Sequence, residues 1–363
     1  MPTASISQDA QDATFSPSDW QILSLHWYPI ALTREVNDQP ISAKLLDQNL
    51  VIWRSSAGLS VAADRCPHRG VPLSMGHLRE GDLVCRYHGL HYNSAGQCSK
   101  IPAHPGAIAP ARLCLKMYPV VEAYGLIWTS LAGELTSSDR PTSSDFLPDF
   151  AEWNDPNYQQ ILPDSVFLET SAGRQMEGFL DVSHFAWVHT ETFGDANNPI
   201  VPSYDVTTTD RGLVADYFST VSNFPSGLQH LSPEGFEWRR TFEVFLPFSA
   251  RLTVHFPGTD SLSETLHERL CILNIASPIT SQTCRMFAPI CRNFDQQSSL
   301  EPIYAFNHQV FAEDKAMIEA QQPKELPLES QAEAHIQADR TSIAYRKGLR
   351  NLGLGTGSIQ WKS

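Results

Sequence analysis

The sequence lacks long apolar runs and clusters of basic residues. No stretch approaches the roughly 18 uninterrupted apolar residues that a transmembrane helix needs, and residues 1–17 lack the basic start and apolar core of a secretory signal. There are 40 acidic against 26 basic residues, a net charge of −14, whereas phosphate contacts need clustered Lys and Arg. We therefore expect no membrane association, no nucleic-acid partner and a cytoplasmic location.

The sequence also lacks a paired set of cysteines. Seven cysteines in 363 residues do not fit a disulfide framework and favour a reducing compartment. The composition, 42% hydrophobic and 18% charged, is that of a globular protein. A chain of this length is too long for one simple core and suits two domains, and its 25 prolines indicate many loops and short strands.

The composition changes along the chain and predicts domain boundaries. Residues 1–17 are polar and are expected to form a disordered tail. Short apolar runs separated by turn residues predict an all-β domain over residues 18–131. Residues 132–150, rich in Ser, Thr, Asp and Pro, are typical of a linker. A second domain is expected over residues 151–352, followed by a flexible Gly/Ser-rich tail over 353–363.

The second domain is predicted to be α+β, an antiparallel sheet with helices packed against it. Apolar residues at helical spacing predict two helices, Glu177–Val188 and Pro302–Glu319. The expected strands are Val206–Thr209, Leu213–Thr220, Glu237–Leu246, Ala250–Phe256 and Leu270–Ser277.

The first candidate metal site consists of two short motifs, each with one Cys and one His. Cys66 and His68 form a C-x-H motif, and Cys85 and His88 form a C-x-x-H motif after sixteen intervening residues. In a Rieske [2Fe–2S] centre two Cys hold one iron and two His hold the other. A Cys2His2 zinc site is the alternative, but zinc spacings usually pair Cys with Cys and His with His. Because each motif in this chain combines one Cys with one His, the pattern favours the [2Fe–2S] cluster.

The second candidate metal site lies in the expected helix Glu177–Val188 and just beyond it. His184 and His189 are five residues apart, and Asp181 lies three residues before His184, on the same face of a helix. The best candidate for a third ligand is Asp314 in the second expected helix. Two His and one carboxylate make the facial triad of non-haem Fe(II) oxygenases, with coordination positions left open. The alternatives are packed, hydrogen-bonded histidines and a solvated acid beside Glu313.

Three segments resemble a known family. CPHRGVPLSMG and CRYHGLHYNSAGQC resemble the ligand loops of the Rieske oxygenases that include the vanillate, dicamba and caffeine demethylases, with Gly89-Leu90 typical of that branch. HQVFAEDKAMIEAQQP resembles the helix that carries their third iron ligand, which decides in favour of Asp314. One departure is that many relatives have Asn three or four residues before the bridging Asp, where this chain has Gly178 and Glu177.

The resemblance implies a helix-grip catalytic domain and a head-to-tail homotrimer, with each cluster beside the neighbour's iron. Asp181 would then be the catalytic bridge, holding His184 and reaching His88 of the neighbouring subunit; a local helical role is the alternative. Because no flavin or nicotinamide motif is visible, NAD(P)H electrons would arrive through a separate reductase, with or without a ferredoxin.

The function that follows is the terminal oxygenase of a multicomponent Rieske system. It would use O2 to hydroxylate, or to O- or N-demethylate, a small aromatic or heterocyclic substrate, as in aromatic catabolism. The alternatives are a ring-dihydroxylating dioxygenase, a Rieske electron-transfer protein with a non-catalytic ligand-binding domain, and a zinc-stabilised binding module. Aromatic side chains of the second domain are expected to supply pocket surface, most of them being ordinary core: Phe218, Phe224, Phe236, Trp238, Phe242, Phe245, Phe248 and Phe256.

Overall fold

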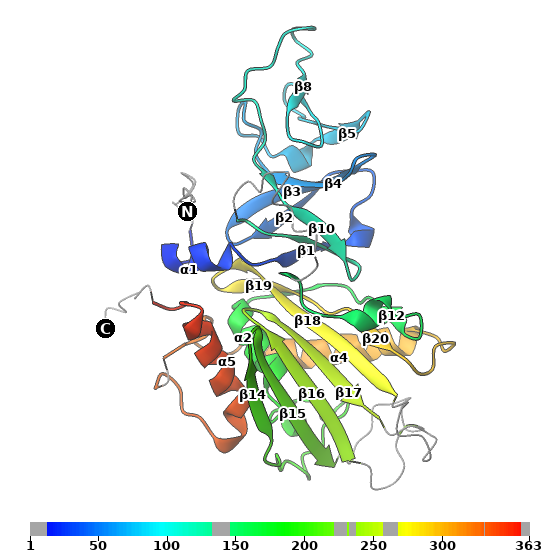
Figure 1. Cartoon of the computed structure of the whole chain (residues 1–363), viewed down its shortest axis with the longest axis vertical. Coiled ribbons are helices and arrows are strands. Elements are labelled where there is room, and N and C mark those ends of the chain that lie inside the picture. The colour runs from blue at the N-terminus through cyan, green and yellow to red at the C-terminus, as the bar shows by residue number, and fades with distance from the viewer. Residues whose placement is uncertain are drawn as a thin grey trace. The chain divides into compact units, whose positions relative to one another are not determined.

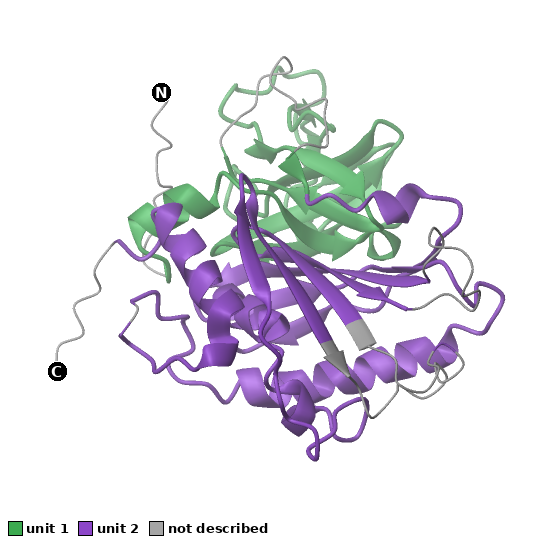
Figure 2. Cartoon of the chain, turned by 60° about the horizontal axis from the view of Figure 1, so that its bottom comes forward, with its two compact units in different colours: residues 1–147 green, residues 148–363 purple. Residues whose placement is uncertain are grey.

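The computed structural model describes residues 13–132, 146–220, 231, 237–256, 268–329 and 331–356. The chain forms two compact units, residues 1–147 and 148–363 (Figure 2). Most of the expected N-terminal tail, of the expected linker and of the expected C-terminal tail lies outside the described residues, as do Phe224 and Phe236. Within the described residues, no helix combines the length and the apolar composition needed to span a bilayer.

The first unit contains one α-helix, α1 (Pro17–Leu23), and three small antiparallel sheets within its described residues. One sheet joins β1 (Tyr28–Leu32), β11 (Leu126–Thr129) and β10 (Val120–Ala123). The second joins β2 (Ile41–Leu45), β3 (Gln48–Ser55), β4 (Gly58–Ala63) and β9 (Met117–Tyr118). The third joins β5 (His77–Arg79), β6 (Asp82–Val84), β7 (His91–Tyr92) and β8 (Cys98–Lys100). The predicted all-β character is confirmed.

The hairpin of β3 and β4 illustrates how the sequence specifies this unit. Its strands pair in register from Leu50 with Ala63 to Ser55 with Gly58, as the apolar runs predict. The turn needs a left-handed residue, which Gly58 supplies at φ +108°. Val51 and Trp53 of this hairpin are fully buried in the cluster that also holds Cys66 and Cys85, so the same core supports both metal-binding motifs.

The second unit is built on a nine-stranded antiparallel sheet (Figure 1). Seven strands follow one another in the order β12 (Gln159–Ile161), β20 (Ile290–Arg292), β18 (Arg269–Thr280), β17 (Ser249–His255), β16 (Glu237–Phe245), β15 (Gly212–Thr220) and β14 (Asp205–Thr209). In addition, β19 (Thr283–Phe287) pairs with β18 and with β13 (Val166–Leu168). All five strands expected from the sequence are present.

Within the described residues of this unit, four α-helices accompany the sheet: α2 (Ala172–Leu180), α3 (Phe185–Val188), α4 (Glu301–Ile318) and α5 (Arg340–Asn351). The long helix α4 lies along one face of the sheet (Figures 1 and 2), and it matches the expected helix within one residue at each end. The predicted α+β class and the antiparallel sheet with packed helices are therefore confirmed.

The expected helix Glu177–Val188 is wrong as a single element. The structure has α2 ending at Leu180 and α3 beginning at Phe185. Asp181 Oδ1 accepts from both the backbone N–H and the hydroxyl of Ser183, each at 2.7 Å, and such local bonds compete with helical hydrogen bonding. The break places Asp181 and His184 in a turn rather than on one helix face.

Candidate metal centres and cavity

The two Cys/His motifs fold into loops of the same shape. In each loop a glycine N–H donates to the carbonyl of the cysteine four residues earlier, Gly70 to Cys66 at 2.8 Å and Gly89 to Cys85 at 2.9 Å. Both glycines have positive φ, +76° and +66°, which a larger residue would adopt only with strain. A Cβ at Gly76 would collide with the Val84 carbonyl. The glycines of these loops are therefore required by the backbone path.

The four side chains of these loops divide into two pairs. Cys66 and Cys85 are buried, whereas the Nδ1 atoms of His68 and His88 lie 3.1 Å apart at the surface. The hydroxyl of Tyr92 lies 3.3 Å from Cys66 Sγ. Burial raises the pKa of the Cys85 thiol, so a thiolate there needs a cation beside it. Buried thiols on one side and exposed imidazoles on the other fit the ligand distribution of a Rieske cluster.

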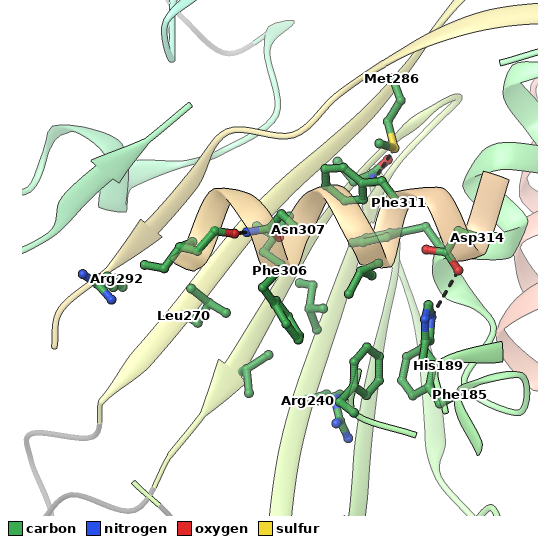
Figure 3. A pocket seen from close by; sticks show the side chains of 18 of the residues that line it. Phe185, His189, Arg240, Leu270, Met286, Arg292, Phe306, Asn307, Phe311 and Asp314 are labelled. Carbon is green, nitrogen blue, oxygen red and sulfur yellow. Dashed lines mark hydrogen bonds and ion pairs between the residues drawn. The ribbon is translucent and has the colours of Figure 1, made fainter. Parts of the chain in front are cut away.

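The residues of the second candidate metal site lie close together in the second unit. His184 Nε2 and His189 Nε2 lie 3.2 Å apart. Asp314 Oδ1 lies 3.4 Å from the first and 3.1 Å from the second, the contact that is dashed in Figure 3. The donor atoms of these three residues all lie within 4.8 Å of one another, close enough to hold one metal ion. Three donors on one side fit a metal ion that keeps coordination positions open.

Each imidazole has a carboxylate at its other nitrogen. Asp181 Oδ2 lies 3.5 Å from His184 Nδ1, and the Nδ1–H of His189 donates to Glu313 Oε2 at 2.7 Å. The Thr192 hydroxyl donates to the same Glu313 oxygen at 2.9 Å. The sequence analysis missed Glu313, which it named only as the acidic neighbour of Asp314. The signal was available, since a ligating His almost always donates its second ring N–H to a carboxylate, carbonyl or water.

The carboxylates around the second candidate metal site favour positive charge there. Burial lowers the pKa of His184, but hydrogen bonds to Asp181 and Asp314 outweigh burial and raise that pKa to about 9. Burial raises the pKa of Asp314, but its hydrogen bonds to His184 and His189 reverse the shift and lower the pKa. The site is therefore electrostatically suited to a cation.

A cavity of about 310 Å³ opens from these residues and runs between α4 and the sheet. His184, His189 and Asp314 all line it. Figure 3 shows His189 and Asp314 at one end, with Phe185, Phe306 and Phe311 among the apolar side chains of the wall. Most of its lining is apolar, with a few polar groups, which is typical of a small-molecule site.

The aromatic residues expected to form the pocket contribute less than the sequence suggests. Of those whose side chains are described, Phe256 lines the cavity. Phe242 packs edge-on against Phe179, Phe245 and Phe248 are buried elsewhere in the unit, and Phe218 is exposed. As the sequence analysis expected, most of them are ordinary core.

The two positions where many relatives carry Asn have different roles in this chain. Glu177 is buried and accepts from the guanidinium of Arg346, at 2.5 Å from Nε and 2.8 Å from Nη2. Gly178 lines the cavity, and a Cβ there would approach Ile318 to 2.9 Å. Neither residue has a side-chain amide to offer the site.

The first unit is a small β structure with two loops whose Cys and His pairs fit a [2Fe–2S] cluster. The second unit brings two His and one carboxylate together beside a cavity between helix α4 and the sheet. These two features together define the class of Rieske oxygenases. Residues 26–119 match the Rieske [2Fe-2S] domain, and residues 168–354 match the vanillate O-demethylase oxygenase C-terminal domain. The Rieske match establishes the [2Fe–2S] cluster as a cofactor of the first unit.

Comparisons over most of the chain agree with these family matches. The chain is 32% identical to methylxanthine N1-demethylase NdmA of Pseudomonas putida over 337 residues, covering 90% of this chain and 88% of that protein. It is 28% identical to the vanillate O-demethylase oxygenase subunit of a Pseudomonas species, covering 82% and 85%. The solved structure of Pseudomonas putida NdmA with caffeine matches with a TM-score of 0.77, 30% identity and 92% coverage of both chains. The chain belongs to the Rieske oxygenase family with a vanillate O-demethylase-type catalytic domain, and it is an enzyme of that class.

Proposed function

We propose that this chain is a terminal oxygenase that binds Fe(II) through His184, His189 and Asp314 and oxidises a methyl or ring carbon of a small substrate. The convergence of three donor atoms at the end of an apolar cavity is the observation that carries this proposal. In the first unit, Cys66 and Cys85 would hold one iron of the cluster and His68 and His88 the other. Relatives that demethylate aromatic or heterocyclic compounds support the reaction class.

The bound metals would supply one-electron transfer and O2 activation, while the protein positions the reactants. The cavity wall would exclude bulk water and hold the substrate carbon facing the open side of the triad. For a methyl ether the balance is ROCH3 + O2 + 2 e⁻ + 2 H⁺ → ROH + HCHO + H2O. We expect the two electrons to come from NAD(P)H through a separate reductase, with or without a ferredoxin, and a cytoplasmic location stays a prediction.

We further propose a head-to-tail homotrimer in which Asp181 bridges to His88 of a neighbouring subunit. Surface features on both units support it. Trp187 is 62% exposed and lines a depression that also includes His184 and Ile336. In the first unit Tyr87, also 62% exposed, packs against His88 with ring centroids 3.9 Å apart. Exposed apolar groups beside both metal sites are suited to burial against a second copy.

Metal analysis provides the first test. The purified enzyme is expected to contain about three Fe and two inorganic sulfides per chain, with the absorbance and reduced-state spin resonance of a Rieske cluster. Inductively coupled plasma analysis and a sulfide assay measure this. Zinc in place of iron at the Cys66/His68/Cys85/His88 site would refute the proposed ligand set.

A substrate screen with a surrogate reductase tests the reaction. Coupled O2 consumption, formaldehyde and a demethylated or hydroxylated product are the expected result. A cis-dihydrodiol product would instead identify a dihydroxylating enzyme, and cluster reoxidation without any product would identify an electron-transfer protein.

Glu313→Gln should weaken Fe(II) binding at the triad by about tenfold to a hundredfold, because an amide holds the His189 imidazole less firmly than a carboxylate. Fe(II) retention is measured by dialysis against a graded chelator series, with the cluster absorbance as an internal standard. Glu301→Gln, an exposed position in the first turn of the same helix, is the control and should leave retention unchanged. Equal retention in both variants would show that Glu313 does not support the ligand.

A further inference from the structure

Four charged side chains, here called the α2 ion cluster, lie together beside helix α2 and are not part of the metal triad. Arg174 and Glu177 belong to α2, Arg346 belongs to α5, and Glu333 lies between α4 and α5. Arg174, Arg346 and Glu177 are only 3%, 5% and 9% exposed. Burying charges is costly unless they are paired and hydrogen-bonded, so the cluster constrains the elements that carry it.

The two arginines and two glutamates of the cluster alternate in a ring. Besides its two bonds to Glu177, the Arg346 guanidinium donates from Nη2 to Glu333 Oε2 at 2.5 Å. Arg174 donates to both oxygens of Glu333, at 2.6 and 3.2 Å. Its Nη1 also lies 3.7 Å from Glu177 Oε2, which closes the ring. Burial raises the pKa of Glu333, but hydrogen bonds to the two arginines outweigh burial and lower that pKa.

The same two guanidinium groups hold the chain segment that follows α4. Arg174 donates to the Pro323 carbonyl from Nε at 3.2 Å and from Nη2 at 3.1 Å. Arg346 donates to the Pro327 carbonyl from Nη1 at 3.0 Å. Helix α4, which carries Asp314, ends shortly before this segment. The cluster therefore fastens α2 and α5 to the chain that leaves α4.

Close packing adds to this fastening. Helix α2 contacts both α4 and α5 (Figure 1). A Cβ at Gly178 would approach Ile318, the last residue of α4, to 2.9 Å, and a Cβ at Gly173 would approach Leu326 to 3.1 Å. Because α2 lies this close to α4 and to the segment after it, a shift of α2 would disturb contacts with both.

The end of α2 leads directly to the proposed iron site. The Asp181 N–H donates to the Glu177 carbonyl at 3.0 Å, so the residue that pairs with Arg346 also closes the last turn of α2. His184 follows this turn, whereas Asp314 comes from α4. The distance of 3.4 Å between His184 Nε2 and Asp314 Oδ1 therefore depends on how α2 is held against α4.

We propose that the residues of the α2 ion cluster are positioning residues, which hold the histidine side and the aspartate side of the triad at the separation that Fe(II) binding requires. This inference rests on the proposed function, because it assigns a support to the same Fe(II) site. The cluster acts through helices α2 and α4, whereas Glu313 acts by bonding a ligand directly.

Glu177→Gln is the first test. The amide keeps the side-chain size but removes one charge, which leaves the Arg346 guanidinium without its bidentate carboxylate. We expect the dissociation constant for Fe(II) at the triad to rise about tenfold or more, as when an outer support of a metal ligand is lost. Chelator competition measures it, with the cluster absorbance as internal standard.

Nitric oxide added anaerobically is the spectroscopic probe. The spin resonance spectrum of its Fe(II) adduct reports the arrangement of the protein ligands, and this spectrum should change in Glu177→Gln. Arg346→Lys should have an intermediate effect on both measurements. A lysine keeps the positive charge, but its ammonium lacks the planar fork that serves two carboxylate oxygens at once.

Glu243→Gln is the matched control. Glu243 on β16 pairs with Arg251 on β17 at 2.6 Å, and Arg251 also lies 3.3 Å from Glu152. The variant therefore removes one carboxylate from a different ion cluster of the same unit. Fe(II) affinity and the nitric oxide spectrum should stay unchanged. Melting temperatures of all variants are measured alongside, which separates a loss of stability from a change at the iron site.

Three results distinguish the possible failures. A lower melting temperature in Glu177→Gln with unchanged Fe(II) affinity and spectrum would overturn the inference, and so would equal weakening of Fe(II) binding by Glu177→Gln and Glu243→Gln. If Glu177→Gln does not fold, Arg346→Lys decides by the same measurements. Weakened Fe(II) binding in the cluster variants, with a wild type that oxidises no methyl or ring carbon, would support the inference and refute the proposed reaction.

Discussion

Asp181→Asn is expected to reduce electron transfer from the cluster to the mononuclear iron by at least about a hundredfold. The substitution keeps the side-chain volume, and the amide oxygen can still accept from Ser183, so the turn after α2 should persist. It removes the carboxylate that lies 3.5 Å from His184 Nδ1 and that we place against the neighbour's His88. An amide cannot accept from two imidazoles with the same charge-assisted strength.

Rapid mixing measures this directly. The pre-reduced Asp181→Asn enzyme is mixed with O2 and substrate, and the cluster absorbance is followed. In the wild type the cluster should reoxidise within one turnover, whereas in the variant it should stay reduced although an external donor can still reduce it. Asp155→Asn is the control, because Asp155 accepts from the Asn157 N–H in the same kind of turn away from the triad.

Two outcomes would contradict the inter-subunit route. Rapid cluster reoxidation coupled to product in Asp181→Asn would make Asp181 a local turn residue. A fully active monomer, identified by light scattering on the active fraction, would show that no neighbouring cluster is needed.

Asp314→Ala should remove the mononuclear iron and reduce turnover to background while leaving the Rieske absorbance intact. Loss of the carboxylate leaves two imidazoles, too few protein ligands to hold Fe(II) in the facial arrangement. Iron should fall from about three to about two per chain. His184→Ala should give the same result, and Cys85→Ser should remove the Rieske spectrum instead.

Glu301→Ala on the same helix is the control for the Asp314 variant, since it removes a carboxylate from the exposed first turn of α4. Iron analysis, visible absorbance and product formation are measured on the same samples. Full iron and activity in Asp314→Ala would show that another residue supplies the third ligand.

The sequence by itself determined the features whose parts lie close together along the chain. Each half of the Cys/His motif is complete within four residues, so Cys66 with His68 and Cys85 with His88 are recognisable without a fold. The short strands of the first unit and helix α4 follow from local periodicity and turn residues. The His184/His189 pair is likewise a local pattern.

Only the tertiary structure decided the contacts that join distant segments. Glu313 meets His189 across 124 positions, and sequence spacing cannot say which of two adjacent acids on α4 faces which imidazole nitrogen. The break after α2 depends on a side chain competing for backbone hydrogen bonds, which helical periodicity does not register. Arg239 and Arg240 look alike in sequence, but strand register turns one to the surface and buries the other in the cavity wall, because successive residues of a strand point to opposite faces.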